Sequence, residues 1–203
     1  RCLSRGLGDV YKRQVMRWMY SKQNVENNLL FGYDKADEVR KKLISLWNIY
    51  SFFCTYASLD KFVPGKNKID KEDLSLLDKW IKEKSKALIV KSKESFDSFE
   101  IDKFLKDVEI FIDDLSNWYI RRNRRRFWKS ENDKDKFVAY QTLYEVLLSL
   151  IKVLSPVLPF ISERMFLNMT SEDSKENKES IHLSNFPKYD GEIDYELISK
   201  VDS

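Results

Sequence analysis

The sequence predicts an all-α protein, an antiparallel bundle of four or five helices. Glycine and proline are scarce, with 5 and 4 among 203 residues, which argues against a turn-rich β-sandwich. Apolar residues recur at steps of three and four over long stretches, the spacing that places them on one face of a helix. The connections between these stretches are short, and short connections favour antiparallel neighbours.

The first helix is expected to begin at Asp34 as its N-cap and to end near Asp60, before Pro64 and Gly65. Acidic residues follow Asp34 in the first turn, where the helix dipole favours negative charge. Its expected apolar stripe consists of Ala36, Val39, Leu43, Leu46, Trp47, Tyr50, Phe53 and Ala57.

The second helix is expected over about 70–96 and the third over about 99–128. A fourth should follow the charged patch 131–136 and continue to Leu154. Ser155 and Pro156 would then begin a fifth helix, with Ser155 as its cap and Pro156 in the first position, where a missing N–H costs nothing.

Residues 171–180 (SEDSKENKES) are expected to form a polar loop. The alternating pattern of residues 180–184 would suit a short strand. This segment contains His182, the only histidine of the chain, for which we expect no catalytic role.

Composition suits a cytoplasmic protein with a packed core. Hydrophobic residues make up 42% of the chain and charged residues 34%. No apolar run approaches the roughly 20 residues that a membrane span needs. Cys2 and Cys54 cannot supply a disulfide framework or a zinc site, so a reducing compartment is expected. Cys54 lies on the apolar face of the first helix and is expected to be a small core residue.

Residues 1–14 are expected to be a non-native, disordered segment, because residues 4–14 (SRGLGDVYKRQ) resemble the in-frame translation of a transposon-type sequencing adapter. An ordinary basic N-terminus is the alternative. Removing residues 1–14 takes four basic and one acidic residue from totals of 36 and 33 and leaves the chain neutral. Only the distribution of charge can therefore indicate a nucleic-acid partner.

Residues 121–129 hold five arginines and one lysine with no acidic residue, interleaved with aromatic residues. Guanidinium groups bind phosphate oxygens in pairs, and unpaired bases stack on aromatic rings and guanidinium planes. The alternative is structural: cations at a helix C-terminus interact with the dipole or pair with acids, and the residues alone favour this interpretation. The candidate RNA-binding residues are Asn117, Arg121, Arg124, Arg125, Trp128 and Lys129.

The helical period divides this segment into two faces. Arg122 and Arg126 follow Leu115 and Tyr119 on the core stripe, and we expect them to pair with buried acids. The candidate RNA-binding residues are expected on the open side. No Gly-rich phosphate loop, nucleophile–base pair or metal-ligand spacing is found, so we expect neither catalytic nor metal-binding residues here.

Five motifs, in order along the chain, resemble the anticodon-binding domain of isoleucyl-tRNA synthetases, which are class I aminoacyl-tRNA synthetases. Residues 113–128 (DDLSNWYIRRNRRRFW) resemble its characteristic helix, 46–57 (LWNIYSFFCTYA) its opening helix and 154–163 (LSPVLPFISE) a later helix start. Residues 17–20 (RWMY) resemble the strand that leaves the catalytic domain, and 182–187 (HLSNFP) the segment that closes the anticodon-binding domain.

The resemblance implies a helical bundle of the anticodon-binding type over residues 34–190. Residues 15–33 would be the end of the catalytic-domain connection, with a linker or strand at 15–31, and 191–203 the start of a truncated C-terminal region. The chain would then be a piece of an isoleucine–tRNA ligase that continues in both directions. The alternatives are a stand-alone helical RNA-binding or adaptor module, or the equivalent domain of a valyl-, leucyl- or methionyl-tRNA synthetase.

The same resemblance implies the partners. This part would bind the anticodon stem-loop of an isoleucine-accepting tRNA, as a monomer and without a membrane. Isoleucine and ATP, with Mg²⁺, would bind the catalytic domain outside this chain, because the HIGH signature requires two histidines and no KMSKS-like sequence occurs. We therefore expect no cofactor in this piece, which should be catalytically inactive by itself.

Overall fold

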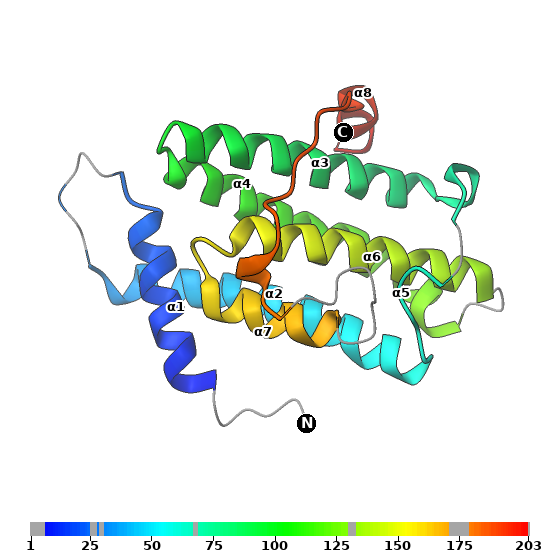
Figure 1. The fold of residues 1–203 in the computed structure, drawn as a ribbon, viewed down its shortest axis with the longest axis horizontal. Helices are drawn as coiled ribbons and strands as arrows, with labels where there is room; N and C mark the ends of the chain where they lie inside the picture. The colour runs from blue at the N-terminus through cyan, green and yellow to red at the C-terminus, as the bar shows by residue number, and fades with distance from the viewer. Residues whose placement is uncertain are drawn as a thin grey trace.

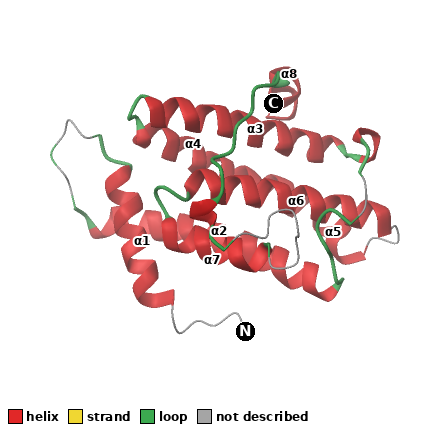
Figure 2. Cartoon of the chain, viewed as in Figure 1, coloured by secondary structure: helices red, strands yellow, loops and turns green. Residues whose placement is uncertain are grey.

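The computed structural model describes residues 7–24, 28, 31–66, 69–129, 133–170 and 179–202. Every regular element in these ranges is a helix, which confirms the predicted all-α class (Figures 1 and 2). The longer elements are α1 (Leu7–Ser21), α2 (Tyr33–Leu59), α3 (Leu76–Asp97), α4 (Ile101–Asp113), the π-helical segment η2 (Asp114–Ile120), α5 (Arg121–Lys129), α6 (Asp133–Leu154), α7 (Pro159–Met169) and α8 (Tyr195–Asp202). Two short 3₁₀ turns are η1 (Lys71–Asp73) and η3 (Ile181–Leu183).

Helix α6 lies at the centre of the bundle and packs against α2, α3, α5 and α7 (Figure 1). The segment 134–154 is long and apolar enough to cross a membrane, but 72% of its apolar stretch is buried inside the bundle. Its apolar character is therefore accounted for by packing on several sides, as expected of a core helix.

The second predicted helix is confirmed, but its start was placed too early. Asp70 caps only the short turn η1, and α3 begins after Ser75. The Ser75 hydroxyl accepts the Asp78 N–H at 3.2 Å, and the Asp78 carboxylate accepts the Ser75 N–H at 2.9 Å. This reciprocal pair satisfies two N–H groups that would otherwise have no partner at the helix start, so it fixes the first turn of α3.

The predicted start of the last bundle helix at Ser155 and Pro156 was wrong. The Leu154 carbonyl accepts the N–H groups of both Val157 and Leu158, so the chain turns there before α7 begins. Proline does occupy the first position of α7, but it is Pro159. Proline is thus found in the first helical position, where its missing N–H costs nothing, but the residue is Pro159 and not Pro156.

The predicted strand at 180–184 was also wrong, because this segment contains the 3₁₀ turn η3. The Ser180 hydroxyl caps the turn by accepting the His182 N–H at 3.2 Å. The Glu163 carboxylate of α7 accepts from the Ser180 hydroxyl at 3.0 Å and from the Ile181 N–H at 2.9 Å. A side chain of α7 therefore satisfies the backbone that a neighbouring strand would otherwise have paired. Most of the predicted loop at 171–180 lies outside the described residues.

Helix α1 differs most from expectation. Residues 1–14 were predicted to be disordered, and residues 15–31 to form a linker or strand. Both predictions are wrong over residues 7–21, which form the single helix α1. Val15, Trp18 and Met19 share one face and are buried, and α1 packs against α2, α4 and α7. Tertiary burial of three apolar side chains thus stabilises a helix whose short pattern was not recognised.

Gln14, on the same buried face, is 1% exposed, and neither polar atom of its carboxamide has a hydrogen-bond partner among the described residues. Burying an amide without a partner costs about 1–3 kcal/mol. Gln14→Leu should therefore raise the free energy of unfolding by about 1–3 kcal/mol in chemical denaturation. The exposed neighbour Arg13 provides a control, since Arg13→Gln should change stability by less than about 0.5 kcal/mol. A loss of stability in the Gln14→Leu protein would contradict this placement.

Candidate nucleic-acid interface

The arginine-rich segment is the last part of a continuous helical rod formed by α4, η2 and α5. This confirms the third predicted helix as one run of chain, over 101–129. The seven residues of η2 are π-helical, and such wide turns are rare and frequently found at functional sites.

The rod buries residues at regular steps of four: Leu115, Tyr119, Asn123 and Phe127. The side chains of Asn117, Trp118, Arg121, Arg122, Arg124, Arg125 and Trp128 are exposed. Five of the six candidate RNA-binding residues therefore lie on the surface. The sixth, Lys129, ends α5, but its side chain lies outside the described residues.

The expectation that Arg122 points into the core was wrong. Arg122 is exposed, and its guanidinium carbon lies 4.2 Å from the ring centroid of Trp118. Its place on the buried face is taken by Asn123, which is 4% exposed. In an ideal α-helix a row of four-residue steps drifts around the axis, but the wider π turn keeps this row facing the core. The sequence pattern assumed a uniform α-helical period.

The expectation for Arg126 is confirmed, since it forms an ion pair with a buried acid. Its Nη1 lies 2.9 Å from both carboxylate oxygens of Asp78, which is fully buried, and its Nη2 lies 2.7 Å from Asp135 Oδ1. The Arg126 side chain is only 15% exposed. One guanidinium thus joins α3, α5 and α6.

Two further donors complete the surroundings of Asp78. The Tyr119 hydroxyl donates to Asp78 Oδ1 at 2.6 Å, and the Ser75 hydroxyl donates to Oδ2 at 2.7 Å. Burial, together with the neighbouring Asp78 carboxylate, raises the pKa of Tyr119 well above its usual value. The phenol therefore stays protonated and remains a donor at all physiological pH values. Asp78, Ser75, Tyr119 and Arg126 together form the Asp78 network, which fixes the rotation of α5 about its axis.

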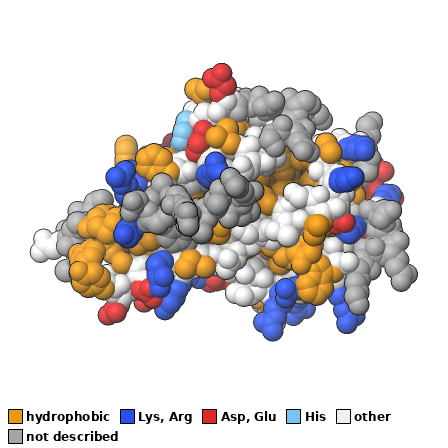
Figure 3. Space-filling model, turned by 90° about the horizontal axis from the view of Figure 1, so that it is seen from below, with side chains coloured by type: hydrophobic (Ala, Val, Ile, Leu, Met, Phe, Trp, Pro, Cys, Tyr) orange, Lys and Arg blue, Asp and Glu red, His pale blue; other side chains and the backbone are white. Residues whose placement is uncertain are grey.

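The exposed arginines of α5 lie outside the Asp78 network, and their positive charges are not neutralised by described acidic residues. Arg121, Arg122, Arg124 and Arg125 make no ion pair with any residue that the structure describes. The guanidinium carbon of Arg124 lies 4.9 Å from the Trp128 ring centroid, so a second arginine–tryptophan pair follows that of Trp118 and Arg122, with the order of the two residues in the chain reversed. Figure 3 shows Lys and Arg side chains gathered around hydrophobic ones at one end of the bundle.

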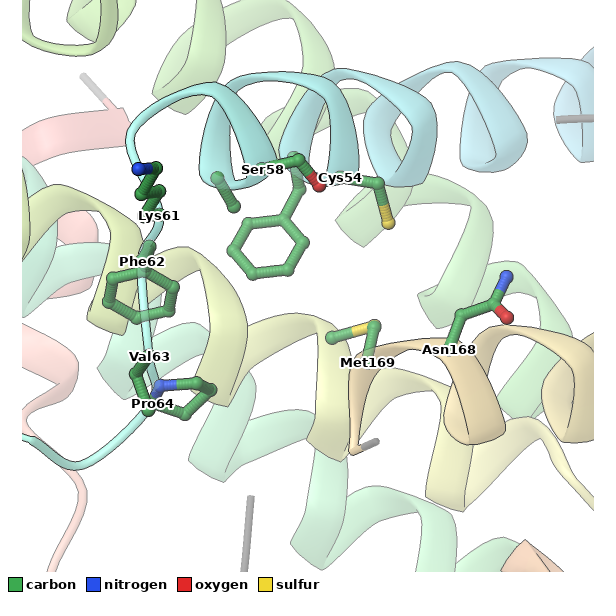
Figure 4. Close-up of a pocket in the computed structure, with 10 residues that line it drawn as sticks. Cys54, Ser58, Lys61, Phe62, Val63, Pro64, Asn168 and Met169 are labelled. Carbon is green, nitrogen blue, oxygen red and sulfur yellow. The ribbon is translucent and has the colours of Figure 1, made fainter. Parts of the chain in front are cut away.

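A hollow of about 510 Å³ opens between the C-terminal part of α2 and the end of α7 (Figure 4). Its lining is mixed, with Phe53 and Met169 beside the polar residues Ser58, Lys61 and Asn168. Cys54 faces this hollow and is half-buried, so it belongs to the margin of the core rather than its centre. His182 is exposed on η3. In the ranges that the structure describes, no group of His, Cys, Asp or Glu residues could hold a metal ion.

An all-α bundle with an acid-free helix edge of arginine and tryptophan defines a helical module with the surface chemistry of an RNA-binding protein. Residues 78–203, more than half of the chain, match the family described as the anticodon-binding domain of tRNA ligase. The chain belongs to this family, as the resemblance of its motifs predicted.

The curated relatives of the chain include several isoleucine–tRNA ligases. The chain is 42% identical over 174 residues to an isoleucine–tRNA ligase of Clostridium novyi, and the match covers 85% of the chain and 17% of that protein. It is 39% identical over 184 residues to an isoleucine–tRNA ligase of Dehalococcoides mccartyi, and this match covers 90% of the chain and 18% of that protein. It is 44% identical over 161 residues to the isoleucine–tRNA ligase of Clostridium tetani, and this match covers 79% of the chain and 15% of that protein. The chain therefore spans less than a fifth of the length of these relatives.

Replacing Arg126 with methionine should lower the free energy of unfolding by about 3–5 kcal/mol, because Asp78 would keep a buried charge without its partner. Arg125→Met is the matched control, since Arg125 is exposed on the same helix, and it should change stability by less than about 0.5 kcal/mol. Urea denaturation of both variants measures the difference. Equal effects of the two substitutions would show that the Asp78 network does not hold α5.

Proposed function

We propose that this chain binds the anticodon stem-loop of an isoleucine-accepting tRNA, as part of a longer isoleucine–tRNA ligase. The observation that carries this proposal is the exposed edge of η2 and α5, where four arginines without ion-pair partners in the described structure lie between two exposed tryptophans. The family of the chain and the isoleucine–tRNA ligases among its relatives agree with it.

Phosphate binding is the main interaction that this edge offers. A guanidinium held against an indole ring has lost much of its freedom, so little conformational entropy remains to be lost when it binds a phosphate oxygen. Arg122 and Arg124 are held in this way, and Arg121 and Arg125 flank them along the helix. Asn117, one turn before Arg121, adds an amide that can donate to or accept from a base edge.

The surroundings of Trp128 support a stacking role for this residue. Its side chain is 51% exposed, with Arg124 over the ring and the Tyr56 ring centroid 6.1 Å away. A base that stacks on the exposed part of the Trp128 ring would join a cluster in which Arg124 lies over that ring and the Tyr56 ring is tilted by 58° to it. Base–aromatic stacking contributes about 1–3 kcal/mol per base.

The remaining functions follow from the relatives and belong to the same proposal. Attachment of isoleucine to tRNA, with ATP and Mg²⁺, would take place in a catalytic domain outside this chain. The whole enzyme would act in the cytoplasm as a monomer. Residues 15–33 would connect to that domain, and residues 191–203 would lead into the following region.

Arg121→Ala and Arg124→Ala should each weaken binding of an isoleucine-tRNA anticodon stem-loop, measured by fluorescence anisotropy over a series of salt concentrations. Each lost phosphate contact should reduce the slope of log K against log salt by roughly 0.7–0.9. Arg122→Ala is expected to behave like them, because Arg122 is exposed. The melting temperature should hardly change, since exposed charges contribute little to stability.

Lys188→Ala provides the control for this series, because Lys188 is exposed on a different part of the chain. Stem-loop binding that is unaffected by all three arginine substitutions would rule out this edge as the RNA-binding surface. An equal loss in the Lys188→Ala protein would indicate non-specific attraction to the whole surface.

A further inference from the structure

A second basic feature lies beside the arginine edge, at the loop that follows α2. This loop and the first turns of α6 enclose a hollow of about 400 Å³, within the range of ligand pockets. We call it the 60–66 hollow. It is lined by Asp60, Lys61, Phe62, Val63, Lys66, Lys136, Phe137 and Tyr140.

The backbone holds the hollow open in a defined shape. At the C-terminus of α2 the Phe62 N–H donates to the Ala57 carbonyl at 2.8 Å, and the Lys61 N–H donates to the Ser58 carbonyl at 3.2 Å. This closure requires a left-handed residue, usually glycine, but here Lys61 adopts it with φ of 50°. Further along, the Gly65 N–H donates to the Gln141 side chain at 3.0 Å and ties the loop to α6.

The lining carries one carboxylate against three ammonium groups. Lys136 Nζ lies 2.6 Å from Asp60 Oδ2, and the Tyr140 hydroxyl donates to the same oxygen. Burial would raise the pKa of Asp60, but these two hydrogen bonds outweigh it and lower that pKa, so the carboxylate is ionised and neutralised by Lys136. Lys61 and Lys66 are exposed and have no ion pair with a described residue. The hollow therefore keeps two net positive charges.

Aromatic rings form the apolar part of the lining and connect it to α5. The centroids of Phe62 and Phe137 are 5.2 Å apart, and both side chains are half-buried. Tyr140 lies 5.4 Å from Phe62 on one side and 5.2 Å from Phe127 of α5 on the other. The C-terminal end of α2 and helix α5 lie at the same end of the bundle (Figure 1). RNA bound along α5 would thus reach this hollow.

We propose that the 60–66 hollow receives one unpaired nucleotide of the RNA, with its base against Phe62 and Phe137 and its phosphate on Lys61 and Lys66. This site rests on the proposed function of the α5 edge and adds a second contact to it. The same site would explain a lysine at a position that favours glycine, because Lys61 lines the hollow from its left-handed backbone position.

Three variants of the 203-residue chain test the site with an isoleucine-tRNA anticodon stem-loop transcript as the probe. Lys61→Gly removes the charge and relieves the strained backbone, so a loss of binding cannot be attributed to poor folding. Combined with Lys66→Gln, it should weaken binding roughly 5- to 30-fold and reduce the salt slope by roughly 1.4, the value for two contacts to single-stranded phosphates. Phe137→Leu should weaken binding about 5-fold or more without changing that slope.

Lys41→Gln together with Lys188→Gln is the charge-matched control, since both lysines are exposed and neither lines the hollow. A stem-loop that carries 4-thiouridine in its loop gives an independent readout, because its photo-crosslinks should map to residues 61–66 or to Phe137. Crosslinks confined to α5, with full binding by the hollow variants, would overturn this site and leave the function of the α5 edge intact. Failure of the unaltered chain to bind the stem-loop would overturn both.

Discussion

The buried carboxylate of Asp78 is the point at which the separate helices of this bundle are held together. An ionised carboxylate without access to water is costly unless it is paired and hydrogen-bonded. Arg126, Tyr119 and Ser75 supply the pairing and the donors, and they come from three different elements. The requirement to satisfy one charge therefore positions the start of α3, the π-helical turn and α5 relative to each other.

This constraint also determines what the surface presents. Arg126 is turned inward, so the remaining arginines of α5 are turned outward, away from the acids of the core. Trp118 and Trp128 then hold two of these guanidinium groups by stacking. A structural ion pair and the proposed nucleic-acid interface, which were competing interpretations of the same segment, thus lie on different faces of one helix.

Helix α1 buries two side chains whose polar atoms are not satisfied. Neither the Gln14 carboxamide nor the Trp18 indole N–H has a hydrogen-bond partner among the residues that the structure describes. Natural sequences rarely leave such groups unsatisfied outside functional sites. Because Trp18 lies outside residues 1–14, the unsatisfied Gln14 does not set that segment apart, and its foreign origin stays a proposal from its resemblance to an adapter.

The sequence by itself determined the helical class, the approximate extents of the long helices and the family, because apolar spacing and long motifs are local properties of the chain. It also identified Arg126 as an inward residue from its place on the stripe. It could not assign Arg122 or Asn123, since the π-helical turn that exchanges them is not visible in a uniform helical period.

The tertiary structure alone decided which acid pairs with Arg126, because Asp78 lies 48 residues away in the chain. It likewise revealed the 60–66 hollow, whose lining comes from the end of α2 and the start of α6. Neither the ion pair nor the hollow leaves a pattern in the local sequence. Each depends on how the helices are rotated and packed, and that arrangement is set by burying apolar faces together while keeping every buried charge paired.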